Sequence, residues 1–83
     1  MPRFDTEWVE YAREQFNSLT STVRQAVMAR VAELERDLDP TRYGTYHEKF
    51  DNYRTSFAYG LITYAVVAEQ KRIILLRITA IEP

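Results

Sequence analysis

Apolar residues in the first part of the chain recur at the spacing of an amphipathic helix. Four of them fall three or four positions apart and would lie on one face of a helix of about four turns: Trp8, Ala12, Phe16 and Leu19. Asp5-Thr6 would cap this helix, and Glu7 would place a carboxylate in its first turn, where the helix dipole favours negative charge. The pattern predicts a first helix that begins near residue 7. Residues 1–4 are either a frayed end or a short stub of strand.

A second apolar stripe predicts a longer helix from about Val23 to Leu38. Its members follow the same period: Val23, Val27, Val31 (or Arg30), Leu34 and Leu38. Thr22 and Ser21 are the alternative caps at its start, and Asp39-Pro40 ends it because proline disfavours helical geometry in the residue before it. Two helices joined by so short a link predict an antiparallel helical hairpin.

The second half of the chain changes to continuous apolar runs typical of strands. Leu61–Ala68 carries no charge and does not alternate, so we expect both of its faces to be covered. Two further strands, Tyr53–Tyr59 and Arg72–Ile81, would complete a meander, and Tyr46–Phe50 is either a short strand or the approach to one. The sequence therefore predicts a single α+β domain over residues 1–83. Its helical hairpin would pack on a three- to four-stranded antiparallel sheet.

Composition narrows the chemistry that such a domain can perform. The absence of cysteine excludes a disulfide scaffold, cysteine-ligated zinc and thiol catalysis. The single histidine, His47, cannot build a multi-histidine metal site, and we expect neither a metal nor a cofactor. The N-terminus lacks the apolar core of a signal peptide, and no apolar run approaches the length of a membrane span. These features predict a cytoplasmic protein without a membrane partner.

Charge is divided unevenly between the two halves of the chain. Residues 1–39 contain five basic and eight acidic residues, whereas residues 40–83 contain six basic and four acidic residues. The predicted sheet is therefore the better candidate surface for an anionic partner.

The order of these elements and several short motifs resemble the RelE/ParE family of bacterial toxins. The motifs that carry the resemblance occur in family order: Phe16–Arg24 between the helices, Asp37–Pro40 after the second helix, Tyr53-Arg54 in a strand, Tyr59–Val67 in the central strand and Ile74–Ile78 in the last strand. The resemblance covers about residues 5–81. It implies a toxin of a type II toxin–antitoxin module, neutralised by a cognate antitoxin protein.

The resemblance implies one of two targets. One branch of the family cuts mRNA on the ribosome, using the RNA's own 2′-hydroxyl as nucleophile, so the protein must supply proton transfer and positive charge. The other branch inhibits DNA gyrase and needs no catalytic residues. This sequence departs from the cutting branch at three positions where that branch has cations or a terminal basic residue: Ser56, Leu61 and Ile81 (or Thr79). The departures favour weak cleavage, a gyrase-inhibitor-like role or a degenerate partner-binding role.

Four residues remain as candidates for catalysis: Arg54, Arg77, His47 and Lys49. Strand alternation predicts that Arg77 points away from the helices with Thr79 and Ile81. Ile74, Leu76 and Ile78 would then form the core face. The alternative for Arg77 is a pair with a cross-strand acid. His47 and Lys49 flank Glu48 in a cluster that could replace the missing acid and base, and the alternative is an ordinary surface loop.

Overall fold

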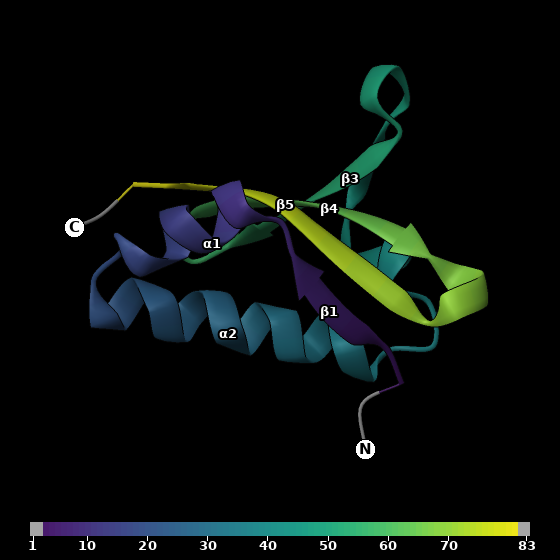
Figure 1. Ribbon diagram of the computed structural model, residues 1–83, viewed down its shortest axis with the longest axis horizontal. Helices are drawn as coiled ribbons and strands as arrows, with labels where there is room; N and C mark the ends of the chain where they lie inside the picture. The colour runs from purple at the N-terminus through teal and green to yellow at the C-terminus, as the bar shows by residue number, and fades with distance from the viewer. Residues whose placement is uncertain (1–2, 82–83) are drawn as a thin grey trace.

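In the part of the chain that the structure describes, two helices lie against one face of a five-stranded sheet (Figure 1). The computed structural model describes residues 3–81. The helices are α1 (Glu10–Asn17) and α2 (Ser21–Arg36), and the strands are β1 (Asp5–Trp8), β2 (Thr45–His47), β3 (Asn52–Phe57), β4 (Gly60–Val67) and β5 (Arg72–Ala80). Three short 3₁₀ turns connect them: η1 (Pro40–Tyr43), η2 (Glu48–Phe50) and η3 (Ala68–Gln70). The α+β class is confirmed.

The first element within residues 3–81 is a strand where the sequence predicted the start of a helix. Strand β1 pairs in parallel with β5, so that Asp5 lies opposite Arg72 and Trp8 opposite Leu75. The Val9 N–H also donates to the Leu75 carbonyl at 3.2 Å. This pairing satisfies backbone groups at the edge of β5, which outweighs the weak helical preference of a segment containing threonine, tryptophan and valine. The predicted purely antiparallel sheet of three to four strands is therefore wrong, and the sheet is mixed.

The predicted N-terminal helical hairpin is also wrong. Helix α1 has only eight residues and packs mainly against β5, while α2 has sixteen and crosses the sheet. The side chain of Gln15 in α1 accepts a hydrogen bond from the Ile78 N–H of β5 at 2.9 Å. Helix α1 thus covers the edge of β5 beyond the point where β1 ends.

The apolar stripe of α2 is largely as the sequence predicted. Val23, Val27, Val31 and Leu34 are buried, and the Thr20 hydroxyl accepts from the Val23 N–H at the start of the helix. The helix ends at Arg36, however, so Leu38 lies outside it and is 70% exposed. The predicted place of Leu38 in the core is wrong, because the chain has already turned towards Pro40.

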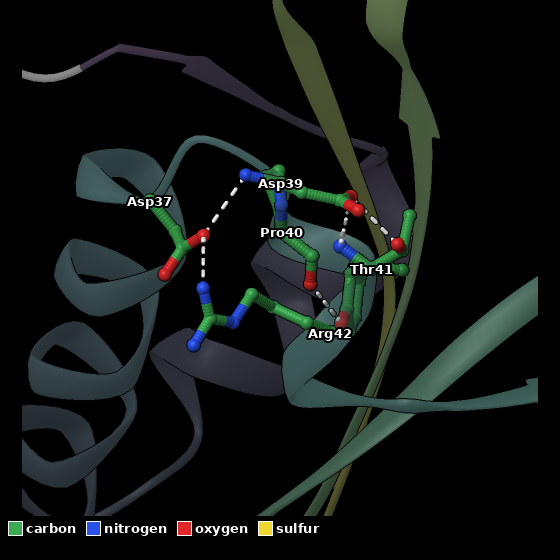
Figure 2. Close-up of polar contacts among 6 residues, drawn as sticks. Asp37, Asp39, Pro40, Thr41 and Arg42 are labelled. Carbon is green, nitrogen blue, oxygen red and sulfur yellow. Dashed lines mark hydrogen bonds and ion pairs between the residues drawn. The ribbon is translucent and has the colours of Figure 1, made fainter.

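The turn after α2 is held by two aspartates (Figure 2). Asp37 Oδ1 accepts from the Asp39 N–H at 2.9 Å and lies 3.8 Å from the Arg42 guanidinium. Asp39 Oδ1 accepts from both the backbone N–H and the hydroxyl of Thr41, at 3.1 and 2.6 Å. These bonds fix η1, whose Pro40 carbonyl accepts a 2.7 Å bond from the buried Tyr64 hydroxyl of the sheet.

Strand β4 is the central strand, flanked by β3 and β5. Its Ile62 and Tyr64 side chains are fully buried under the helices. On its other face Leu61 is 41% exposed and Thr63 is half-buried. The prediction that both faces of this strand are covered is wrong. One face of the sheet is open, and it carries the candidate site.

Strand β5 contains an irregularity that reverses its side-chain alternation. Tyr64 pairs with Leu75 and Thr63 pairs with Arg77, which leaves Leu76 without a partner as in a β-bulge. As a result Ile73, Leu75 and Ile78 face the core, so the predicted core positions of Ile74 and Leu76 are wrong. Ile78 is buried as predicted, and Arg77 lies on the open face as predicted.

Candidate functional site

Two arginines and a threonine form one row across the open face of the sheet. Arg54 of β3 lies opposite Thr63 of β4, and Thr63 lies opposite Arg77 of β5. Because neighbouring strands are about 4.8 Å apart, the backbones of the two arginines are separated by about 10 Å. Two arginine residues therefore flank a single threonine, in a row that the backbone pairing of the sheet holds in register.

Neither arginine is neutralised by a neighbouring carboxylate. Ion pairs within residues 3–81 join Arg30 to Glu33, Arg42 to Asp37 and Arg72 to Glu7, and none of them involves Arg54 or Arg77. The Arg77 guanidinium lies 5.8 Å from the ring centre of Tyr11, a cation–π contact that leaves its charge in place. The cross-strand acid expected in the alternative interpretation of Arg77 is not there, because Thr63 occupies that position.

The arginine row is the floor of two adjoining hollows of about 230 Å³ each. Both are lined by Arg54, Thr63 and Arg77; the other lining residues are Phe50, Asn52, Leu61, Leu76 and Thr79. Each hollow is smaller than the pockets that enclose small-molecule ligands. None of these lining residues carries a negative charge. The shape and charge fit an extended anionic chain that lies across the strands.

His47 and Lys49 lie apart from the two arginines, around Phe50 at the tip of the β2–β3 hairpin. The His47 ring stacks on Phe50 with 5.1 Å between ring centres, and the Lys49 ammonium lies 5.5 Å from the Phe50 ring centre. This hairpin projects away from the helix layer (Figure 1). His47 is nevertheless paired across the strands with Asn52, which does line one hollow. The structure therefore places His47 next to a groove residue, whereas Lys49 contacts Phe50 and lines neither hollow.

Sequence reasoning missed Asn52 and Thr63 as groove residues. Asn52 precedes Arg54 by two positions, so both side chains lie on the open face of β3. The apolar run of β4 contains two polar groups, the Thr63 side chain and the Tyr64 hydroxyl. Both signals are present in the sequence, but they become informative only after the face of each strand is known. Ser56, where the resemblance placed a second cation, lines neither hollow.

Two solved structures share this fold over nearly their whole length. One is the RelBE2 toxin–antitoxin complex from Mycobacterium tuberculosis, in which the matched chain has a TM-score of 0.84 and 18% sequence identity, covering 98% of this chain and 100% of that chain. The other is the intact RelBE toxin–antitoxin complex from E. coli, with a TM-score of 0.69, 21% identity and coverage of 96% and 99%. The fold is RelE-like. No family model matches the chain, and no curated protein matches it by sequence.

The RelE-like chain has a larger hollow of about 580 Å³ on its helix layer, away from the arginine row. It is lined by residues of α2 and the end of α1: Phe16, Ser21, Arg24, Gln25, Met28 and Ala29. It contains one charged group and none of the predicted site residues, so the chemistry favours the smaller hollows. No three histidine or acidic side chains within residues 3–81 are grouped to hold a metal ion. No helix in that part of the chain is long and apolar enough to cross a membrane.

Proposed function

We propose that this RelE-like protein is the toxin of a type II toxin–antitoxin module and that its open sheet face binds RNA. The fold supports the module, because both matched structures are toxin–antitoxin complexes. The observation that carries RNA binding is the row of Arg54, Thr63 and Arg77, which has no carboxylate beside it. Guanidinium groups bind phosphate oxygens in bidentate geometry. Such a protein would act in the cytoplasm, on the ribosome and its mRNA, and would be held inactive by an antitoxin.

The same groove supports binding better than cleavage. Attack by the RNA's own 2′-hydroxyl needs a group that accepts its proton, and arginine stays protonated in proteins. The lining residues of the two hollows include no histidine, lysine or acid. His47 lies opposite Asn52 on the neighbouring strand, and an imidazole can accept a proton in acid–base catalysis. We therefore infer strong contact with the RNA backbone, weak cleavage, and a base role for His47 in any cleavage that occurs.

Expression of the chain without its antitoxin tests the proposal. We expect growth to stop, and we expect Arg54→Ala or Arg77→Ala to relieve the arrest, because each removes half of the phosphate contact. Primer extension on ribosome-bound message would reveal cuts, faint with the natural chain and absent with either variant. Arg72→Ala is the matched control, since Arg72 also lies on β5 but is paired with Glu7 at 3.4 Å. It should leave the arrest unchanged.

A gyrase-directed toxin is the second candidate, and the lack of a general base in the groove favours it. Growth arrest with intact message and accumulating gyrase-dependent DNA damage would support this candidate over RNA cleavage. Unaffected growth in a sensitive host would contradict both toxin proposals and leave a partner-binding role. Co-expression of a short acidic protein encoded beside this chain should restore growth in either toxin case.

A further inference from the structure

Asn52 has a side-chain oxygen that the described part of the fold leaves without a hydrogen-bond partner. It is 9% exposed, and its Oδ1 is buried without a hydrogen-bond partner among the described residues. A buried carboxamide oxygen without a partner destabilises a fold, so native proteins seldom keep one without another reason. The surroundings of Asn52 supply a reason for keeping this oxygen unpaired.

Asn52 faces the groove next to the arginine row. It lies two residues before Arg54 on β3, so the two side chains are about 7 Å apart along the same face. It lines one hollow together with Phe50 and Leu76, whose apolar side chains form part of the same lining. A chain whose phosphate lies between Arg54 and Arg77 would therefore bring its neighbouring group against a carboxamide with apolar side chains in the same hollow.

We propose that Asn52 reads a nucleobase of the bound RNA, next to the phosphate that Arg54 and Arg77 hold. A carboxamide offers one donor side and one acceptor side, which together match the edge of adenine. Single-stranded RNA exposes its base edges for such contacts, and the apolar side chains of Phe50 and Leu76 in the same hollow would contact the base. This inference rests on the proposed RNA binding and adds a preference for adenine at one position.

Fluorescence anisotropy with short RNA homopolymers tests the inference at low salt. The wild-type chain should bind oligo(A) roughly tenfold more tightly than oligo(U), within the range of a bidentate amide–adenine contact. Asn52→Ala and the isosteric Asn52→Leu should bring this ratio to about one while retaining affinity for both. Ser56→Ala is the matched control, because Ser56 lies on the same face of β3 but outside both hollows. It should keep the ratio. Arg54→Ala should weaken both RNAs equally.

Thermal unfolding of the same variants separates a recognition role from a structural one. Loss of an unpartnered buried amide should leave Tm unchanged or raise it, and Asn52→Leu should do so most clearly. A wild-type chain that binds both RNAs equally would overturn the inference while sparing the proposed function. The inference would also be overturned if the ratio of oligo(A) to oligo(U) affinity stayed at its wild-type value in both Asn52 variants, whether their Tm was unchanged or lower. A chain that binds neither RNA would overturn the proposed function and this inference with it.

Discussion

A single hydroxyl connects the sheet to the loop that follows α2. Tyr64 is fully buried, stacks near Tyr53 and donates to the Pro40 carbonyl at 2.7 Å. Burial raises the pKa of the Tyr64 hydroxyl, so it remains a donor at any ordinary pH. Gly44 leaves room for this group, because a Cβ there would lie 2.6 Å from the Tyr64 oxygen. Tyr64 therefore fixes the position of η1 against the core.

Tyr64→Phe should lower the free energy of unfolding by about 1–2 kcal/mol, because it leaves a buried carbonyl without its donor. Urea denaturation followed by circular dichroism would measure the change. Tyr59→Phe is the control, since no hydrogen bond of the Tyr59 hydroxyl is found within residues 3–81. An equal loss in both variants would show that the bond to Pro40 contributes nothing of its own.

Asp37 makes the same region sensitive to acid. The hydrogen bond from the Asp39 N–H, assisted by Arg42, lowers the pKa of the Asp37 carboxyl below its ordinary value near 3.8. A carboxylate with a lowered pKa in the folded state stabilises the fold above that ordinary value. This stabilisation is lost as pH falls through the lower folded pKa. Asp37→Asn should therefore have the lower Tm at pH 6, and the difference should shrink between pH 4 and pH 2. A gap that stays constant over this range would contradict the assignment.

At the scale of elements, the sequence predicted the α2 stripe from its local periodicity and the central strand from its uncharged apolar run. It failed at β1 because the pairing of Asp5–Trp8 with Arg72–Leu75 is decided by a partner far along the chain. It also failed at Leu76, where a bulge changes which side chains face the core. The predicted alternation put Ile74 and Leu76 in the core and Arg77 on the open face. Arg77 does lie on the open face, but it does so because the bulge at Leu76 reverses the alternation that begins at Ile73.

The contact between α1 and β5 gives an expectation at the same scale. Gln15→Ala should lower the free energy of unfolding by about 1–2 kcal/mol, because it leaves the partly buried Ile78 N–H without an acceptor. Glu14→Ala is the control on the same helix, since Glu14 is exposed. Amide hydrogen exchange at Ile78 should become faster in the Gln15 variant alone. Unchanged protection at Ile78 would show that another group seals this edge.

At the scale of the whole molecule, the open face has fewer cations than the groove can accommodate. Leu61 is 41% exposed and lies in the row next to Arg54 and Arg77, in the hollow that both arginines line. The open face is therefore partly apolar at a position from which a further guanidinium could contact the proposed bound RNA. The exposed Leu61 and the lack of a proton acceptor among the residues that line the hollows both support the weak cleavage that we propose.

Leu61→Arg should strengthen RNA binding and steepen its salt dependence by about 0.7 in log K against log salt, the value for one further phosphate contact on a single strand. Leu38→Arg makes the same change of charge at a position that is 70% exposed and far from the groove along the chain. Titrations at several salt concentrations would compare the two. Equal slopes would mean that net charge, rather than the geometry of the groove, determines affinity.

The pairing of β1 with β5 has a consequence for synthesis on the ribosome. The first strand to be translated must wait for the last, and at about 5–20 residues per second several seconds separate them. Until then β1 has no partner and the outer edge of the sheet has no strand. The sheet can therefore close only after β5 has been synthesised, and the arginine row is incomplete until Arg77 of that strand is present. Any protein that recognises the closed sheet could bind only after β5 has emerged from the ribosome.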